Sequence, residues 1–502
     1  MFELLILVLI ASVLVIFFYF FLTPKQTLTL EEQESIRISE ALKNIFYYKI
    51  PGVDKTLAQI FGDRINTNEE IIDYGAFLGG VNSTAIAYNY FENYYGYKWA
   101  LNFSTLEETT SIIWIPNSAD GNSISKISAI SGRELGRYYT VSRGISGNPS
   151  RVAIDSRGNA WIGNRGTNTL VKIGLKENGE CEDKNNDGEI ESSEDLNNDG
   201  EIDSSEMVSF EKDECILANV ILGSKMIGGL GSAGVRAVCV DANDNVYAGL
   251  YQDKKLFYIS REGSILKEWD LTNYIKDSRY GPYGCFVDSK NIVWISLVLD
   301  KALLRFEPSN NNFERIEVGK IVYGIAPCRE EDCLVINCWV DSSLVKINTT
   351  TKGKIFDKSF SELFQGRGVI VDEEGYTYAV STSNNLIVKF DKDGNILIKN
   401  TTCSNPAGIG EDIFGKIWVA CLDASVWRFD KNLNVELKTS FGTQHYVYNF
   451  FTSYKTPPIV IGKEVGFGYL QKETERLKTF VAPVPIPSYS GKVINFVFRT
   501  WQ

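Results

Sequence analysis

Residues 149–173 read PSRVAIDSRGNAWIGNRGTNTLVKI, and this stretch contains the pattern that decides the fold. A short apolar run ends at Asp155, a Gly-Asn turn follows, and a second run begins at Trp161. After another turn, a third run ends at Ile173. Asp side chains bond to the backbone of a turn and Gly adopts positive φ, so the intervening residues favour tight turns. The stretch is therefore predicted to be a meander of short antiparallel strands.

The same order of runs and turns recurs about every 40 residues, which is a spacing typical of four-stranded repeats. The clearest matching runs are Val238–Asp241 with Val246–Gly249, Cys285–Asp288 with Val293–Ser296, Gly324–Ala326 with Leu334–Asn337, Val369–Asp372 with Ile387–Phe390, and Gly408–Glu411 with Ile417–Ala420. An earlier unit opens at Ile112–Ile115, and a later one runs from Val447 to Phe480, which makes eight candidate units.

One four-stranded unit cannot bury both of its faces without neighbours, so these repeats predict an all-β fold, a β-propeller of four-stranded blades. Ring closure can merge or discard a terminal unit, so seven and eight blades both fit. An open β-solenoid and tandem sandwiches are the alternatives. The recurring Trp161, Trp294 and Trp418 are expected to pack between blades rather than to form a ligand platform.

The negative charge of the chain is concentrated in one segment. The 502 residues include 51 Lys and Arg against 63 Asp and Glu, a net charge of -12. Residues 182–214 hold fourteen acidic residues and only Lys184 and Lys212 as bases, which accounts for the whole net charge. Without a basic excess elsewhere, binding to nucleic acid is not expected. A single histidine, His445, excludes multi-histidine metal sites and multi-histidine catalysis, whereas a mechanism that uses one histidine stays open.

Two consecutive segments of the acidic stretch match the twelve-residue calcium loop of EF-hands. Residues 183–194 and 195–206 each offer oxygen ligands at positions 1, 3 and 5, Gly at 6, a backbone carbonyl at 7, an acid at 9 and Glu at 12. Two Ca²⁺ ions are the expected cofactors, and a solvated acidic loop is the alternative. The candidate ligands are Asp183, Asn185, Asp187, Glu189, Glu191 and Glu194 in the first loop and Asp195, Asn197, Asp199, Glu201, Asp203 and Glu206 in the second.

The two loops are directly joined, because Glu194 is followed by Asp195. No helices fit between them, so the helix pair that opens in calcium sensors cannot form. The segment is therefore interpreted as a calcium-ordered structural insert, with an affinity in the weak extracellular range of about 10⁻⁴ to 10⁻³ M.

Eight of the nine cysteines are predicted to form disulfides, which leaves Cys338 as the odd one. The predicted pairs are Cys181 with Cys215 at the base of the insert, Cys328 with Cys333 across a four-residue turn, Cys403 with Cys421 on either side of a turn, and Cys239 with Cys285 on the first strands of adjacent units. A zinc site at Cys328, Cys333 and Cys338 is the alternative, although no histidine or fourth cysteine lies nearby.

Residues Leu4–Leu22 are apolar apart from Ser12 and the hydroxyl of Tyr19, and a helix of this length spans a bilayer. The segment is longer than the apolar part of a signal peptide and lacks its basic start, so an uncleaved anchor is expected. A long signal peptide and a buried helix are the alternatives. The cysteines, the calcium-type loops and the glycosylation sequons favour an extracellular location for the bulk of the chain. The sequons lie at Asn82, Asn102, Asn348 and Asn400.

The chain is accordingly divided into four parts. They are a transmembrane anchor helix at 1–24, a partly helical stalk or collar at 25–100, a propeller at 101–482 that carries the insert at 181–215, and a closing strand or tail at 483–502. The helical character of the stalk is predicted from capping-box patterns that begin at Thr29 and Thr67.

The runs at 149–166 and 170–173 resemble those of the streptogramin lyase-like (virginiamycin B lyase-like) and NHL-type β-propeller superfamily. The resemblance covers about Ile112–Gly442 and implies the propeller fold. The lyases of that superfamily use a histidine and glutamate cluster at the mouth of the propeller. This chain has Trp161–Asn164 where a lyase-like blade has Trp-Phe-Thr-Glu, and its one histidine is His445. No catalytic residue is therefore carried over.

Arg151, Arg236 and Arg367 fall just before the first strand of three units, where the ligand mouth of a propeller is commonly placed. Salt bridges between blades are the favoured interpretation of these arginines, and binding of an anionic ligand is the candidate functional role. The expected function is that of a membrane-anchored extracellular calcium-binding propeller, which binds a surface protein or glycan or supports the cell envelope.

Two other functions compete with this expectation. One is a polysaccharide or small-molecule lyase or hydrolase that uses the propeller funnel. The other is a subunit of a pilus-like surface filament, because the apolar start with an early Glu loosely resembles a processed type IV pilin. The basic-Gly processing site of such pilins is absent, and self-assembly of the native protein would favour the filament.

Overall fold

The computed structural model describes residues 98–196, 201–223, 234–329, 332–447, 451–452, 459–468, 477–485 and 493–501. They belong to two compact units, of which one is Ser111–Thr456 and the other combines strands that precede and follow it in the sequence. The predicted anchor at 1–24 and the predicted stalk up to residue 97 lie outside the described residues. Within the described part of the chain, no helix has the length and apolar character needed to cross a membrane.

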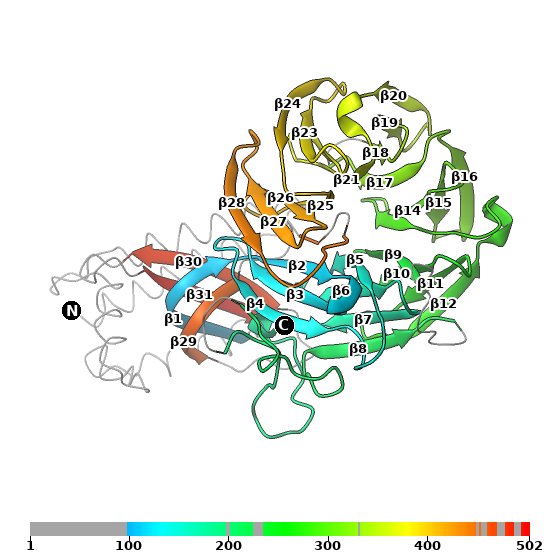
Figure 1. Cartoon of the computed structure of the whole chain (residues 1–502). Helices are drawn as coiled ribbons and strands as arrows, with labels where there is room; N and C mark the ends of the chain where they lie inside the picture. The colour runs from blue at the N-terminus through cyan, green and yellow to red at the C-terminus, as the bar shows by residue number, and fades with distance from the viewer. Residues whose placement is uncertain are drawn as a thin grey trace, which may run out of the picture. The chain divides into compact units, whose positions relative to one another are not determined.

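Residues Ser111–Thr456 form a β-propeller of seven sheets, which are arranged as a ring (Figure 1). Blade 1 contains β2 (Ile112–Asn117), β3 (Ser123–Ser128) and β4 (Glu134–Tyr139). Blade 2 contains β5 (Pro149–Ile154), β6 (Ala160–Asn164), β7 (Thr169–Ile173) and β8 (Ile216–Ile221). Blade 3 contains β9 (Val235–Val240), β10 (Val246–Leu250), β11 (Lys255–Ile259) and β12 (Ile265–Asp270).

The remaining four blades repeat the same antiparallel meander. Blade 4 contains β13 (Gly284–Val287), β14 (Val293–Leu297), β15 (Ala302–Glu307) and β16 (Asn312–Glu317), and blade 5 contains β17 (Val322–Pro327), β18 (Cys333–Cys338), β19 (Ser343–Asn348) and β20 (Lys354–Ser359). Blade 6 contains β21 (Gly366–Val371), β22 (Thr377–Ser381), β23 (Leu386–Phe390) and β24 (Ile396–Thr401), and blade 7 contains β25 (Pro406–Glu411), β26 (Ile417–Cys421), β27 (Ser425–Phe429) and β28 (Val435–Ser440). The predicted all-β propeller is confirmed, and it has seven blades.

Four short 3₁₀ helices connect strands in the described part of the propeller. They are η1 (Ala119–Gly121), η2 (Lys176–Asn178), η3 (Thr272–Tyr274) and η4 (Ser361–Leu363). The acidic insert lies between η2 and β8 of blade 2.

The turn that follows each first strand is built as its sequence predicts. In blade 2, the amide of Asp155 donates to the carbonyl of Asn159 at 3.0 Å, and Asp155 Oδ1 accepts from the amide of Asn159 at 2.9 Å. Gly158 has a φ of 88°, which is the left-handed conformation that the turn requires. Asp241, Asp288, Asp372 and Asp412 form the same backbone bond in their blades.

The recurring tryptophans pack in the core, as predicted. Trp161, Trp294 and Trp418 are fully buried, and so is Trp114 at the matching position of blade 1. Trp294 and Trp418 each donate the indole N–H to the turn aspartate of their own blade at 2.8 Å. This bond satisfies the polar atom of a large buried ring, so that each tryptophan fixes the turn against the blade.

Blade 1 is completed by residues from the far end of the propeller sequence, which we name the closing segment (residues 444–447 together with 451 and 452). The amide of Ser118 donates to the carbonyl of Gln444 at 2.8 Å, and the amide of Trp114 donates to the carbonyl of Phe451 at 2.9 Å. Val447 and Phe451 are fully buried. A Cβ atom at Gly408 of β25 would lie 2.6 Å from Val447 Cγ1, so the absence of a side chain there lets the segment pack against blade 7.

The single histidine belongs to this packing. His445 is fully buried, and its ring centre lies 4.9 Å from that of Phe441. Burial lowers the pKa of His445 to about 4, so the imidazole is neutral at pH 7.

The second unit contains a four-stranded sheet in the order β29, β1, β31, β30. Its strands are β1 (Lys98–Thr110), β29 (Ile459–Gly468), β30 (Leu477–Pro485) and β31 (Val493–Trp501). The strands of the predicted eighth repeat therefore join another sheet and not a blade. The propeller ends at Thr456 rather than at residue 482. The predicted closing strand at 483–502 does not complete a blade, since the closing segment bonds to blade 1 instead.

Candidate functional site

The three arginines that are candidates for binding an anion lie on the first strands of their blades. Arg151 is in β5, Arg236 in β9 and Arg367 in β21. The first strands of neighbouring blades contact one another around the centre of the ring (Figure 1). The arginine side chains are nearly buried there, with 6%, 3% and 7% of their surface exposed. The ring therefore brings together three cations that are far apart in the sequence.

Three tyrosines meet the arginines at the same place. Tyr283 precedes β13, Tyr323 lies in β17, and Tyr446 belongs to the closing segment. The Tyr323 and Tyr446 hydroxyl oxygens are 2.8 Å apart, and the Tyr283 hydroxyl donates to Tyr323 at 2.9 Å and lies 3.2 Å from Tyr446. We name Arg151, Arg236, Arg367, Tyr283, Tyr323 and Tyr446 the axial cluster.

The guanidinium groups of the cluster contact the tyrosines directly. Arg236 donates to the hydroxyl of Tyr283 and, at 3.4 Å, to that of Tyr446. The guanidinium carbon of Arg151 lies 4.7 Å from the ring centre of Tyr283, and that of Arg367 lies 5.2 Å from the ring centre of Tyr446. Distances below about 6 Å are attractive between a cation and a ring. The arginines thus contact tyrosines of other blades, and Arg151 also donates to the carbonyl oxygens of Tyr283 and Ser150.

The arginines make the centre of the cluster electropositive. Burial by itself would raise the pKa of the Tyr446 hydroxyl, but the guanidinium groups of Arg236, Arg367 and Arg151 lower it well below its usual value. The positive charge that lowers this pKa also attracts an anionic group of a ligand at hydrogen-bond distance.

The cluster is bordered by side chains that are partly exposed. Tyr446 itself is half-buried, as are Arg165, Tyr280 and Trp339. The guanidinium carbon of Arg165 lies 4.3 Å from the ring centre of Tyr446, and that of Arg367 lies 4.9 Å from Trp339. Tyr280 stacks on the buried Tyr251, with ring centres 4.6 Å apart. Aromatic surface and positive charge therefore lie side by side where the cluster meets solvent.

The tyrosines were missed by reasoning from the sequence, although a signal was present. Arg236 and Arg367 each lie five residues before the turn aspartate of their blade. Tyr283 lies at the same distance from Asp288, and Tyr323 precedes a Gly at the start of a first strand as Tyr283 does. Aligning the blades at that aspartate would have placed Tyr283 beside the arginines. Tyr446 shows no such pattern in the sequence, because it belongs to the closing segment, which reaches blade 1 from the other end of the propeller sequence.

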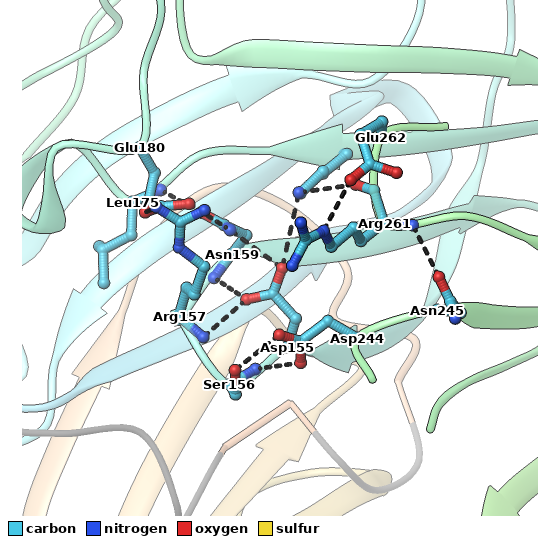
Figure 2. A network of polar contacts seen from close by, with 12 residues as sticks. Asp155, Ser156, Arg157, Asn159, Leu175, Glu180, Asp244, Asn245, Arg261 and Glu262 are labelled. Carbon is cyan, nitrogen blue, oxygen red and sulfur yellow. Dashed lines mark hydrogen bonds and ion pairs between the residues drawn. The ribbon is translucent and has the colours of Figure 1, made fainter. Parts of the chain in front are cut away.

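A polar network at the other end of β5 holds the base of the acidic insert (Figure 2). The Asn159 side-chain amide donates to Asp155 and to Glu180, at 2.9 Å in each case, and its oxygen accepts from the amide of Leu175. Arg157 forms an ion pair with Glu180 at 2.5 Å. Burial raises the pKa of both Asp155 and Glu180. These bonds attach the start of the insert to the first turn of its own blade.

The same network continues into blade 3. The backbone amide and the hydroxyl of Ser156 donate to Asp244 at 2.8 and 2.6 Å, and the amide of Arg261 donates to Asn245 at 3.1 Å (Figure 2). Lys172 donates to the carbonyl of Arg261 at 2.9 Å. The turns of two neighbouring blades are thereby joined below the insert.

The acidic insert also packs on blade 1 through charged groups. Lys126 of β3 is fully buried and lies 2.7 Å from Glu177 and 3.9 Å from Glu194. Lys176 lies 2.9 Å from Glu194, and Arg133 lies 2.9 Å from Asp195. The two residues at the junction of the predicted calcium loops are therefore bonded to cations of the propeller.

The first predicted calcium loop has the turn structure that its sequence requires. Asp183 Oδ2 accepts from the amide of Gly188 at 2.9 Å, and Asn185 Oδ1 accepts from the amide of Asp187 at 2.8 Å. Asp187 Oδ1 accepts from the amide of Glu189 at 3.0 Å, and Gly188 has a φ of 93°. Hard oxygen donors at positions 1, 3 and 5 thus lie on one tight turn, which fits the ligand set of Ca²⁺.

The other predicted ligands are arranged less favourably. Glu191 accepts from the side-chain amide of Asn185 at 3.0 Å, whereas Glu194 is held by lysines. In the second loop, Asn197 and Asp199 lie outside the described residues, Glu206 accepts from the amide of Asp203 at 3.1 Å, and Glu201 lies in the described part. Among the described residues, no three carboxylates of these loops have oxygens within 4.8 Å of one another.

All four predicted disulfides are present. They join Cys181 to Cys215, Cys239 to Cys285, Cys328 to Cys333 and Cys403 to Cys421. Cys338 is a buried free thiol whose pKa is raised by burial. The alternative zinc site is not formed, because Cys328 and Cys333 are bonded to each other.

The predicted glycosylation sites fall in different parts of the chain. Asn348 and Asn400 are half-exposed residues of β19 and β24 in the propeller, and Asn102 lies in β1. Asn82 lies outside the described residues.

The chain was compared with known proteins and with solved structures. The sequence matches no protein-family model and no curated protein. Virginiamycin B lyase from Staphylococcus aureus is 15% identical, with a TM-score of 0.45 over 60% of this chain and 87% of that one. A streptogramin B lyase is 14% identical, with a TM-score of 0.46 over 64% and 94%. The WD40 propeller domain of Doa1 is 12% identical, with a TM-score of 0.44 over 61% and 87%. At this level the similarity carries no conclusion about ligand or activity.

Proposed function

We propose that this protein is an extracellular binding propeller that holds an anionic group of its ligand at the axial cluster. The observation that carries the proposal is the convergence of Arg151, Arg236 and Arg367 on three tyrosines whose hydroxyls are hydrogen-bonded to one another. Hydrogen bonds between guanidinium and a carboxylate or sulfate are stronger than neutral ones, and partial burial strengthens them further.

The ligand class that fits best is an acidic glycan. The half-exposed rings of Tyr280 and Trp339 provide apolar surface beside the guanidinium groups, and a sugar ring presents C–H groups to such surface while its carboxylate meets the charge. A nucleic acid does not fit, because the propeller body carries no basic excess outside this enclosed cluster.

Calorimetric titration of the full chain tests the anion site. An oligomer of a uronic acid should bind, and the neutral hexose oligomer of the same length should not. Replacing Arg236 and Arg367 together by Met should weaken binding at least about tenfold, since a hydrogen bond to a charged group is worth about 1.5–3 kcal/mol. The exposed Arg261→Met is the matched control and should leave the affinity unchanged. Equal binding by the double variant would contradict the proposal.

The same proposal includes two bound Ca²⁺ ions in the insert, with Asp183, Asn185 and Asp187 as ligands of the first. The turn bonds of residues 183–189 support it. Calcium calorimetry on the full chain tests it, with Asp187→Ala and Asp199→Ala expected to remove one site each. Unchanged binding in both variants, or no binding to the native chain, would refute the calcium sites.

The proposed location is the outer face of a membrane, with Leu4–Leu22 as the anchor and glycans at the four sequons. Four disulfides support an oxidising compartment. Protease treatment of intact cells is the test, since an exposed propeller would be degraded and an internal one protected. Association of the purified protein into filaments or layers would instead favour the structural role.

A further inference from the structure

One of the six residues of the axial cluster, Tyr446, belongs to the closing segment. Tyr446 is preceded by the buried His445 and followed by the buried Val447, and the segment bonds to blade 1 through Ser118 and Trp114. The other five members of the axial cluster lie on blades 2 to 6. The cluster therefore exists only while the last segment of the propeller is seated on the first blade.

The contacts of Tyr446 show how much of the cluster depends on this seating. Its hydroxyl lies within 3.2 Å of the hydroxyls of both Tyr283 and Tyr323, and it accepts from Arg236 at 3.4 Å. Its ring also lies 4.3 Å from the guanidinium carbon of Arg165. Withdrawal of the segment would remove the phenol group that all these side chains share and would open the centre of the cluster to water.

Withdrawal of the segment requires only a local set of contacts to break. Among the described residues, those contacts include the backbone bonds to blade 1, the bond from the His445 amide to the Cys421 carbonyl of blade 7, the packing of Val447, Phe451 and Thr452 against the glycines of β25, and the bonds of Tyr446. Proteins open in such local units with free energies below that of global unfolding. Any ligand that binds the closed form better than the open form stabilises closure to the same extent.

We infer that binding of an anionic ligand at the axial cluster and closure of the propeller ring are thermodynamically coupled, with Tyr446 as the residue that joins the two events. This inference rests on the proposed anion site and adds a consequence for the fold. Binding of the ligand stabilises the closed ring, and displacement of the closing segment lowers the affinity of the propeller for the ligand.

Hydrogen exchange on the full chain tests the coupling, with a uronic acid oligomer as the probe. The reporters are the amides of Trp114 and Ser118, because their acceptors are carbonyls of the closing segment. At a ligand concentration of about a hundred times Kd, their exchange should slow about a hundredfold. The amide of Asp430 in blade 7, which bonds to Asn434 in a turn away from the closing segment, serves as control and should not change.

The possible results separate the inference from the proposed function. If calorimetry detects no binding, the proposed anion site itself is wrong. If the ligand binds and the two reporter amides exchange at their original rates, the coupling is wrong while the site stands. Equal slowing of every slow amide would also overturn the coupling, because it would show stabilisation against global unfolding only.

A variant gives an independent check. Tyr446→Phe keeps the ring that packs in the segment but removes the hydroxyl that meets Tyr283, Tyr323 and Arg236. The exchange of the Trp114 amide without ligand should then rise, and the slowing by ligand should shrink. Tyr274→Phe, on η3 and outside the cluster, is the matched control and should behave like the native protein.

Discussion

The amide of Trp114 in the first blade donates to the carbonyl of Phe451 near the end of the propeller sequence. This bond joins two residues that no local pattern connects, and it attaches the last part of the propeller sequence to the first blade. The stability of the ring therefore depends on how closely the closing segment can approach its neighbours.

Gly408 sets that approach on the side of blade 7. A Cβ atom there would lie 2.6 Å from Val447 and 3.0 Å from Phe451, so Gly408→Ala must displace the closing segment. The free energy of unfolding in urea should fall by about 1–3 kcal/mol. Gly353→Ala is the control, because the nearest atom to its new Cβ is 3.6 Å away. Equal stability of the two variants would show that the segment does not need the close approach.

Glu411 should make the stability depend on pH. Burial raises its pKa to about 7 in the folded protein, in spite of Arg329 and Lys431 nearby, against 4.5 in the unfolded chain. The folded state therefore holds the proton more tightly. Its contribution to stability is complete below pH 4.5 and is lost as the pH rises to about 7.

The test compares urea unfolding of the native protein and Glu411→Gln between pH 5 and 8. The native protein should lose on the order of 1–3 kcal/mol more than the variant over this range. Glu317→Gln is the control, because the Arg315 and Lys276 side chains lower the pKa of Glu317 to about 2, which lies outside the range tested. Parallel curves for native protein and Glu411→Gln would contradict the assignment.

The disulfides should differ in their contributions. Cys239–Cys285 joins blades 3 and 4 across 46 residues, whereas Cys328–Cys333 spans 5. Loop-closure entropy predicts a loss of about 4 kcal/mol for removal of the first and about 2 kcal/mol for the second. Double Cys→Ser variants compared by denaturant unfolding provide the measurement, and a larger loss for the short loop would contradict the entropic account.

Calcium binding should compete with an internal lysine. Glu194, the last ligand predicted for the first loop, lies 2.9 Å from Lys176. Lys176→Met should therefore raise the calcium affinity of that loop up to about fivefold, the value of a partly exposed ion pair. Lys212→Met removes the same charge from the same insert and is the control. Equal affinities in the two variants would mean that Glu194 is not a ligand.

Much of the fold was predictable because its signals are local. The aspartate turn at Asp155, the buried Trp161 and their repetition every blade each follow from a few neighbouring residues. The Cys239–Cys285 pair followed from the repeats, since equivalent positions of adjacent blades lie close together, and the other three pairs followed from turns and from the ends of the insert. The arginines of the axial cluster were found for the same reason.

The features that could not be predicted from the sequence depend on contacts between segments that are far apart in it. Residues Ile459–Gly468 have the apolar character of a strand, but local pattern does not decide which sheet a strand joins. Their partner is β1, and not a blade. The same limit concealed Tyr446, whose neighbours Tyr283 and Arg236 come from other blades. The count of seven blades therefore became known only when the partners of the last strands were known.

The pairing of β1 with β29 has a mechanical consequence. Thr110 is the last residue before the propeller, and Ile459 lies three positions after the propeller ends at Thr456. These two residues are paired in the sheet of the other unit. The propeller is thus a long excursion of the chain between two adjacent strands of another sheet. Neither end of the ring is a free terminus from which unravelling can start, so a pull on either flank of the chain would first load the β1–β29 ladder and spare the blades.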